Sequence, residues 1–272
     1  MTDRVIDSLL GADDPAPVEE VRPPVPEYPV LLVCDHASAR IPAALFNLGL
    51  APLDLGRHIA VDIGAAALTR GVAALLGLPA VLSRYSRLVV DCNRHLDDPS
   101  AFPKASDDTV IPGNQDLPQA ERDRRVAAIY RPYHAAVREA LAKLGPLPGV
   151  VAIHSFTPEF AGVVRPWHVG ILWDQDAGLA EPLIAALRVE EDLCVGDNEP
   201  YSGRHPAGYT MDAHAESRGL PHVSIEVRQD LLATPAGIRR WTALLATALR
   251  PILQARFGTA VATGTCLTPD GH

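Results

Sequence analysis

The sequence predicts a single-domain α/β protein with a mixed, mostly parallel sheet flanked by helices. Short apolar runs of strand length alternate along the chain with longer segments in which alanine and leucine recur at helical spacing. Strands that alternate with helices form a sheet covered on both faces. We find no internal repeat and no convincing domain boundary, so residues 30–257 are predicted to form one domain.

The two ends of the chain differ in composition from this central region. Residues 1–29 contain a proline-rich, acidic stretch that cannot hold a regular helix or an inner strand. We interpret them as an arm that is partly mobile or lies across the surface, in a position to cover an edge of the fold. Residues 258–272 are interpreted as a weakly ordered tail.

The strands are predicted from apolar runs that end in polar or turn-forming residues. Residues 150–153 are a typical case: Pro148-Gly149 precedes them, and the apolar character stops at His154. In chain order the predicted strands are Val30–Cys34, Ala80–Ser83, Leu88–Cys92, 150–153, Trp167–Trp173 and His222–Arg228.

The helices are predicted from apolar residues at intervals of three and four positions. Pro132 predicts a kink in the longest of them, and Thr234 before Pro235 is typical of a helix N-cap. In chain order the predicted helices are Arg57–Leu76, Glu121–Leu144, 176–190, the short 212–219 and Thr234–Phe257. Residues 96–118 are rich in Asp, Pro and Gly and predict a long, functional or mobile loop.

Charge and cysteine usage exclude several classes of protein. The net charge of −9 and the lack of a basic block argue against a nucleic-acid partner. The four cysteines are scattered and form no CxxC pair, as expected for reduced thiols of a cytoplasmic protein. No signal peptide is recognisable, and no apolar run approaches the ~20 residues of a membrane span. We therefore expect a cytoplasmic monomer or small homo-oligomer whose partner is a small molecule.

Polar residues follow several predicted strands at the point where each strand ends. They are His36, Asn93-Arg94, His154 and the Glu226–Arg228 segment. Ligands bind at the carboxyl ends of strands in open α/β sheets, so these side chains are expected to converge on one pocket.

A zinc site is one interpretation of this convergence. His36 and His154 are candidate ligands, and Asp62 is the nearest acidic residue, early in the predicted helix Arg57–Leu76. A catalytic zinc ion takes three such ligands and leaves one position for water. The spacing is long and irregular, without an HExxH motif, so each residue also has a purely structural interpretation. His154 can bond a neighbouring carbonyl, and Asp62 can be a solvated first-turn acid.

Glu226 is the most unusual residue of the last strand. It alternates with apolar residues along the strand. Burial of an unpaired carboxylate would cost several kcal/mol of folding free energy. Glu226 is therefore either a general base with a raised pKa or the ion-pair partner of Arg228 or Arg94. The Asn93-Arg94 pair suits recognition of a carboxylate, with a surface salt bridge to Asp97 or Asp98 as the alternative. Cys34 lies inside an apolar run, where a free cysteine is usually inert packing.

The chain resembles the N-formylglutamate amidohydrolase family. The segments that carry the resemblance are "DHASARIP", "VDIGAAAL", "SRYSRLVVDCNRHLDD", "YRPYH", "AIHSFTP", "PYSG" and "GLPHVSIEVRQDL". A more distant resemblance connects "VDCNRHLD", "IHSF" and "IEVR" to the zinc carboxypeptidases. This implies a carboxypeptidase-like (phosphorylase/hydrolase-like) fold.

The resemblance also implies roles for individual residues. His36, Asp62 and His154 would bind zinc or another divalent metal, and Glu226 would be the general base and then the proton donor. Ala39 occupies the position of the second carboxypeptidase ligand, so the second ligand is assigned to Asp62, with His58 as the alternative. The substrate-binding candidates are Asn93, Arg94, Arg228, Tyr201 and His205.

The implied reaction is hydrolysis of a small N-acyl amino acid, with N-formyl-L-glutamate yielding formate and glutamate. The alternatives are a zinc carboxypeptidase or amidase for short peptides, and a catalytically silent ligand-binding relative. Intact His36, Asp62, His154 and Glu226 argue against the silent relative.

Overall fold

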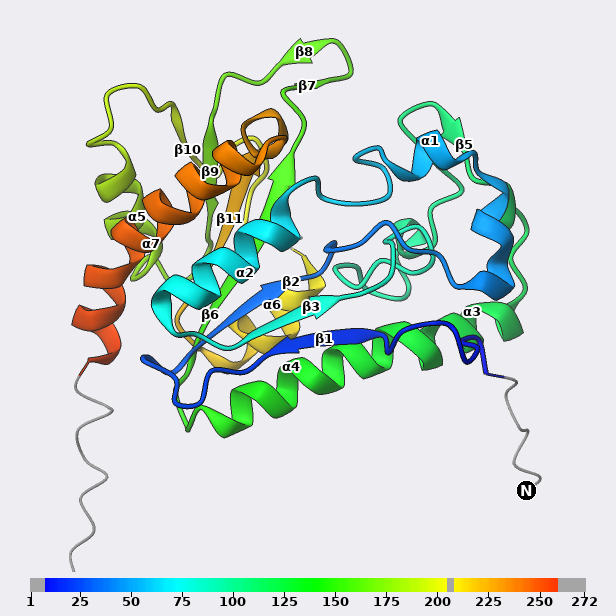
Figure 1. Ribbon diagram of the computed structural model, residues 1–272, viewed down its shortest axis with the longest axis horizontal. Helices are drawn as coiled ribbons and strands as arrows, with labels where there is room; N and C mark the ends of the chain where they lie inside the picture. The colour runs from blue at the N-terminus through cyan, green and yellow to red at the C-terminus, as the bar shows by residue number, and fades with distance from the viewer. Residues whose placement is uncertain (1–7, 205–207, 259–272) are drawn as a thin grey trace, which may run out of the picture.

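The computed structural model describes residues 8–204 and 208–258, which form a mixed seven-stranded sheet with helices on both faces (Figure 1). In spatial order the strands are β1 (Val18–Val21), β3 (Ala80–Ser83), β2 (Val30–Cys34), β6 (Gly149–Phe156), β11 (His222–Arg228), β9 (Val169–Leu172) and β10 (Val195–Asp197). The β3–β2, β2–β6, β6–β11 and β9–β10 pairs are parallel, and β1–β3 and β9–β11 are antiparallel. The predicted α/β class with a mostly parallel sheet is confirmed.

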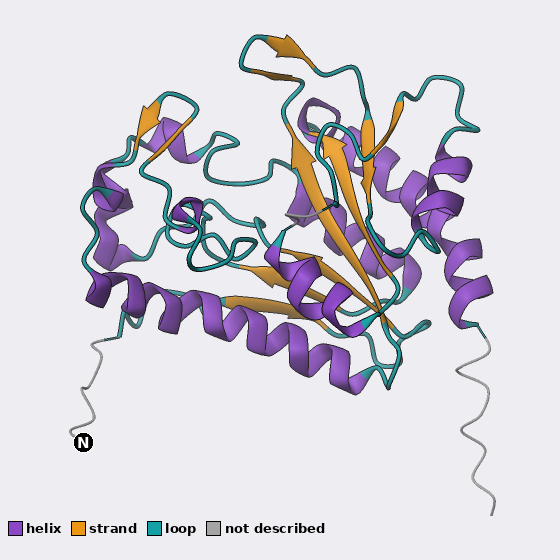
Figure 2. Ribbon diagram, turned by 180° about the vertical axis from the view of Figure 1, so that it is seen from behind, coloured by secondary structure: helices purple, strands orange, loops and turns teal. Residues whose placement is uncertain are grey.

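Each face of the sheet has its own apolar core. Helices α2 (Ala65–Leu76), α5 (Ala180–Leu187) and α7 (Pro235–Phe257) cover one face, and α4 (Arg131–Lys143) and α6 (Tyr209–His214) cover the other (Figures 1 and 2). Ile153 of β6 belongs to the first core and Ala152 to the second. Because side chains alternate along a strand, His154 points to the same face as Ala152, toward α4 and α6.

The remaining elements are short. The additional helices are α1 (Pro52–Leu55) and α3 (Gln119–Arg125), and two hairpins are formed by β4 (Ala105–Ser106) with β5 (Thr109–Val110) and β7 (Glu159–Phe160) with β8 (Val163–Val164). Tighter turns are η1 (Ala43–Gly49), η2 (Pro99–Ala101), η3 (Pro112–Asn114), η5 (Glu216–Arg218) and η6 (Gln229–Leu232).

The predicted long helix is interrupted as expected. A π-helical turn, η4 (Val126–Tyr130), separates α3 from α4 immediately before Arg131-Pro132. Proline has no backbone N–H to donate, so it fits where the regular hydrogen-bond ladder changes. The predicted N-cap of α7 is also confirmed, because Gly237 N donates a 3.1 Å hydrogen bond to Thr234 Oγ1.

The largest departures from the predicted elements concern one strand and one helix start. Leu88–Cys92 is buried but forms turns, because β1 from the N-terminal segment occupies the sheet edge beside β3. Helix α2 begins at Ala65 instead of Arg57, after Gly64 adopts a left-handed φ of 82°. Asp62 therefore lies in the turn before the helix, not in its first turns.

The described cysteines agree with the expectation of reduced thiols. Cys34 and Cys92 are buried, Cys194 is exposed, and all three are free. Cys266 lies outside the described residues. Burial raises the pKa of the Cys34 thiol, which suits inert packing. No helix within the described ranges has both the length and the hydropathy of a membrane span.

Gly64 is predicted to be critical for the turn that carries Asp62. A Cβ atom at position 64 would clash with the Leu232 side chain. The alanine would also have to adopt the left-handed φ that Gly64 has. We expect Gly64→Ala to lower the free energy of unfolding by about 2–4 kcal/mol, measured by urea denaturation.

Gly219→Ala is the matched control. Gly219 has a φ of 61°, but a Cβ atom there would meet no heavy atom within 4 Å. We expect Gly219→Ala to lower the free energy of unfolding by only about 1 kcal/mol, because it introduces backbone strain alone. Equal losses for the two variants would contradict the packing role of Gly64.

Candidate active site

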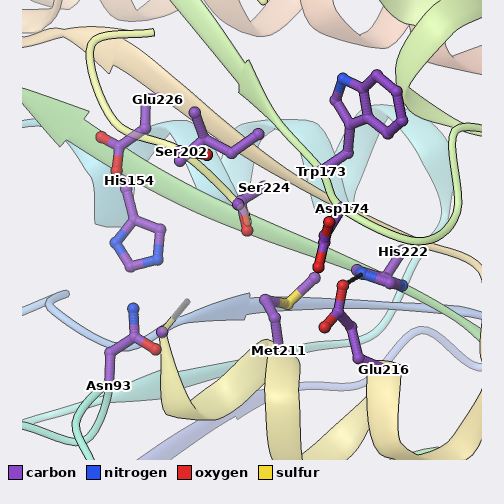
Figure 3. A pocket seen from close by; sticks show the side chains of 13 residues that line it. Asn93, His154, Trp173, Asp174, Ser202, Met211, Glu216, His222, Ser224 and Glu226 are labelled. Carbon is purple, nitrogen blue, oxygen red and sulfur yellow. Dashed lines mark hydrogen bonds and ion pairs between the residues drawn. The ribbon is translucent and has the colours of Figure 1, made fainter. Parts of the chain in front are cut away.

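A small pocket lies along β11 on the sheet face toward α6, and it reaches His154 in the carboxyl-terminal half of β6. It has a volume of about 60 Å³. His154 and Glu226 lie at one end and His222 with Glu216 at the other (Figure 3). Its other lining residues are Asn93, Leu172, Trp173, Asp174, Ser202, Gly203, Gly208, Met211 and Ser224.

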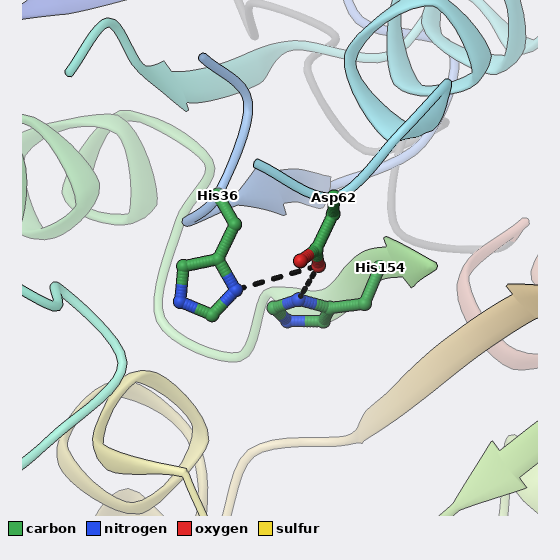
Figure 4. A group of neighbouring side chains, drawn as sticks. All are labelled: His36, Asp62 and His154. Atoms are coloured by element: carbon green, nitrogen blue, oxygen red, sulfur yellow. Dashed lines mark hydrogen bonds and ion pairs between the residues drawn. The ribbon is translucent and has the colours of Figure 1, made fainter. Parts of the chain in front are cut away.

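Three potential metal ligands meet beside this pocket. His36 lies two residues after the end of β2, Asp62 lies three residues before α2, and His154 lies within β6. Asp62 Oδ2 is 2.9 Å from Nδ1 of His154 and 3.4 Å from Nδ1 of His36 (Figure 4). All three side chains are buried, and their candidate ligand atoms lie within 4.8 Å of one another.

Backbone hydrogen bonds hold the Asp62 turn against the two strands. Asp62 N donates to His36 O at 3.0 Å, and Ser155 Oγ donates to Ile63 O at 2.9 Å. Ser155 N also lies 3.4 Å from Asp62 Oδ2. The parallel pairing of β2 with β6 brings His36 and His154 close together, and these bonds add Asp62 to them.

A second layer of carboxylates orients the two histidines. His36 Nε2 is 2.7 Å from Asp91 Oδ1, and His154 Nε2 is 3.3 Å from Asp35 Oδ2. Asp35 Oδ1 in turn accepts a 2.6 Å hydrogen bond from Thr210 Oγ1. Both rings therefore direct Nδ1 toward Asp62. An outer carboxylate on the remaining ring nitrogen is typical of histidines that bind metals.

Arg87 joins the inner and outer carboxylates. Its guanidinium donates to Asp91 Oδ2 at 2.9 Å and lies 3.5 Å from Asp62 Oδ1. Burial disfavours its charged form, but Asp91 and Asp62, with a smaller contribution from Tyr201, raise its pKa.

The electrostatics of the cluster favour a positive charge at its centre. Burial alone would raise the pKa of Asp62, but His36 and His154 hold it well below its usual range. Burial alone would lower the pKa of His154, yet the neighbouring carboxylates of Asp35 and Asp62 raise that pKa well above its usual value. Asp35, with a pKa of about 2 despite its burial, stays ionised because of its contacts with His154. Two imidazoles among ionised carboxylates form a donor set suited to a divalent cation.

Glu226 lies beside this cluster in a different environment. It is directly opposite His154 in the parallel β6–β11 register, and it is buried. Its Oε2 accepts no hydrogen bond from the described residues. Burial raises its pKa to about 7, although the nearby His154 lowers it. The alternative ion pairs do not form: Arg228 pairs with Asp230 at 2.8 Å, and Arg94 donates to Ser100 Oγ.

The predicted substrate-binding residues are placed differently from one another. Asn93 lines the pocket, and its Oδ1 accepts a hydrogen bond from Thr210 N at 3.1 Å. Arg94 and Arg228 are not among the lining residues. Tyr201 is 44% exposed and lies next to Ser202 of the lining. His205 lies outside the described residues. His58, the predicted rival of Asp62, lies 3.8 Å from Asp107 and outside the ligand cluster.

Sequence reasoning did not identify Asp91 or Arg87 as residues of the site. Asp91 had a usable signal, since it interrupts the apolar run "LVVDC" as Glu226 interrupts "VSIEV". Arg87 had no local signal, because its position depends on Asp62 in another part of the chain.

Comparison with known proteins identifies the family. The sequence matches the family model of N-formylglutamate amidohydrolase over residues 28–233. The chain belongs to the N-formylglutamate amidohydrolase family. It is therefore a hydrolase that acts on amide bonds. A search of curated proteins found no match.

Two solved structures resemble this amidohydrolase. The gene product Atu2144 from Agrobacterium tumefaciens is 37% identical, with a TM-score of 0.86 over 91% of this chain and 99% of its own. An N-formylglutamate amidohydrolase from Ralstonia eutropha JMP134 is 23% identical, with a TM-score of 0.63 over 88% of this chain and 98% of its own. At this lower identity the second likeness concerns the fold alone.

The raised pKa of Glu226 predicts a pH-dependent stability. The folded carboxyl titrates at about 7 and the unfolded one near 4.5, so between these values the folded state holds a proton that the unfolded state has lost. The stability contributed by this group is present below pH 4.5 and is lost as the pH rises through 7. At pH 8, metal-free Glu226→Gln should be more stable than the metal-free wild type by about 1 kcal/mol or more.

Urea denaturation between pH 4.5 and pH 8 measures this difference. Glu159→Gln removes an exposed glutamate of β7 and controls for the loss of one negative charge. If Glu226→Gln and Glu159→Gln shift the unfolding curve equally at every pH, Glu226 is not desolvated as described.

Proposed function

We propose that this amidohydrolase is metal-dependent and hydrolyses a small N-acyl amino acid, with N-formyl-L-glutamate as the first substrate to test. The products would be formate and glutamate. The observation that carries the proposal is the convergence of His36, Asp62 and His154 on one point, with Glu226 beside them. A ligand set next to a carboxyl group that titrates near neutral pH is suited to hydrolysis of an amide bond.

The three converging residues fit a zinc ion. Catalytic zinc sites use three nitrogen or oxygen ligands from the protein and leave one coordination position open. His36 Nδ1, Asp62 Oδ2 and His154 Nδ1 supply such a set, and Asp91 and Asp35 support the two rings from behind. When bound, zinc lowers the pKa of a coordinated water to about 7 and polarises a carbonyl group.

Glu226 is proposed as the group that moves the proton. Its pKa of about 7 allows it to accept a proton from the attacking water and to pass it to the departing amine. A bound cation beside His154 would lower this pKa, since it favours the ionised carboxylate. Arg87 holds Asp62 and Asp91 in position through its contacts with both carboxylates.

The pocket suits a small substrate. The whole pocket has a volume of about 60 Å³, which leaves room for a small acyl group. We assign Asn93 to contact with the substrate, since its amide faces the pocket beside Gly208. To reach a ligand there, Arg94 and Arg228 would have to leave Ser100 and Asp230. Roles for Arg94, Arg228, Tyr201 and His205 remain predictions, as do cytoplasmic location and oligomeric state.

Metal analysis of purified variants tests the assignment of roles. We expect the wild type to contain about one equivalent of zinc per chain. Asp62→Asn should lose most of it, because an amide is a weaker ligand than a carboxylate. Glu226→Gln should keep the metal and lose turnover by about 100-fold or more. A wild type that stays largely metal-free after reconstitution, or a fully active Glu226→Gln, would overturn the proposal.

The substrate class is tested by comparing N-formylglutamate with short peptides. We expect formate release from N-formylglutamate to have a higher kcat/KM than the cleavage of dipeptides, because the pocket is small. Faster cleavage of dipeptides would instead favour a carboxypeptidase or amidase of short peptides. A metal-loaded protein that turns over neither would be a silent relative.

A further inference from the structure

Arg165 carries a buried guanidinium without a carboxylate partner. It follows the β7–β8 hairpin, and only 8% of its surface is exposed. Nη1 donates to Thr157 Oγ1 at 3.2 Å and to the Tyr201 hydroxyl at 3.0 Å. Within residues 8–204 and 208–258, no carboxylate pairs with it and no group accepts a hydrogen bond from Nε or Nη2.

Three aromatic rings surround this guanidinium. Its central carbon lies 4.8 Å from the ring centroids of Phe160 and Tyr201 and 5.9 Å from that of Phe156. Cation–π contacts attract the charge and fix its plane, but they do not neutralise it. A buried charge is costly unless it is paired. The rings therefore hold a cation whose Nε–Nη2 edge remains available to an anion.

The guanidinium lies at the rim of the candidate active site. Phe156 is two residues beyond His154 on β6, so it points to the same face of the sheet, roughly 7 Å further along. Tyr201 precedes Ser202 and Gly203, which line the pocket. The β7–β8 hairpin that leads to Arg165 extends past the end of β6 (Figure 1).

Three other arginines near this end of the sheet, Arg87, Arg94 and Arg228, already have partners. Arg87 bonds Asp91, and Arg228 bonds Asp230. Arg94 donates to Ser100 Oγ and to the carbonyl of Asn93. Arg165 alone among these four is buried and has only neutral acceptors.

We propose that Arg165 binds a carboxylate of the substrate and thereby selects N-acyl amino acids over neutral amides. This inference rests on the proposed function. The planar guanidinium would receive the carboxylate through its Nε–Nη2 edge as two parallel hydrogen bonds. Tyr201 and the hairpin residue Phe160 are then positioning residues that hold Arg165 toward the pocket. The carboxylate is either the α-carboxylate of the amino acid or that of its side chain.

Arg165→Met tests this role, because methionine keeps an apolar chain against the three rings and removes the charge. Its kcat/KM is measured with N-formylglutamate, N-formylglutamine and the α-amide of N-formylglutamate. We expect a loss of about 10- to 100-fold with N-formylglutamate and little loss with the analogue that lacks the recognised carboxylate. The analogue whose kcat/KM is unchanged by Arg165→Met lacks the carboxylate that Arg165 binds.

Two further variants complete the comparison. Arg240→Met removes an exposed arginine of α7 and should leave all three rates unchanged. Arg165→Lys keeps the charge but loses the planar fork, so it should recover part of the rate with N-formylglutamate. If Arg165→Met loses the same factor on all three substrates, or loses nothing, the assignment is wrong. Arg165→Lys answers the same question if the methionine variant does not fold.

Direct binding separates failure of this inference from failure of the proposed function. If the metal-loaded wild type hydrolyses none of the three substrates, the proposed function is wrong. Calorimetric titration with L-glutamate and glutarate then tests Arg165 without turnover. Affinity at least about 10-fold weaker in Arg165→Met than in Arg240→Met supports a carboxylate site. Equal affinity in the two variants, or no binding to the wild type, overturns it.

Discussion

The Asp62 carboxylate lies between two imidazoles, one from the turn after β2 and one from β6, and the rest of the site is arranged around this contact. One oxygen, Oδ2, is within 3.4 Å of Nδ1 of both His36 and His154. The contact exists because β2 and β6 are parallel neighbours and because a left-handed Gly64 turns the chain back before α2. Buried charges of this kind are stable only when their remaining atoms have partners. Asp35, Asp91 and Arg87 provide those partners. The buried His36–Asp62–His154 cluster therefore requires them.

The carboxylates of the site divide into two electrostatic groups. Asp62, Asp35 and Asp91 face imidazoles or a guanidinium, which keep them ionised although they are buried. Glu226 faces the pocket, where burial outweighs the attraction of His154 and raises its pKa to about 7. Environments that separate the pKa values of neighbouring acids also separate their roles. Ionised carboxylates are suited to holding a cation and its ligands, whereas a carboxyl that titrates near neutrality is suited to exchanging protons.

The position of Glu226 illustrates how the sheet builds the site. Val223, Ile225 and Val227 pack into the core beneath α7, so the alternate residues of β11 face the pocket on the other side. The parallel register then places Glu226 opposite His154. An acidic residue in an apolar strand is tolerated because its own face of the sheet is polar at this end. The same face continues past His154 to Phe156, on which Arg165 rests.

The sequence by itself determined the strands β2, β3 and β11, the capped start of α7 and the candidate residues His36, His154 and Glu226. Each of these has a local signal, since an apolar run followed or interrupted by a polar residue is visible within a few positions. Tertiary structure decided the rest. Leu88–Cys92 has the pattern of a strand, but β1 occupies the sheet edge, so the segment packs as buried turns and places Asp91 behind His36. The contacts of Asp62, Arg87 and Arg165 join residues that are far apart in the chain. No local pattern specifies such contacts, because they depend on which strands become neighbours and in which register.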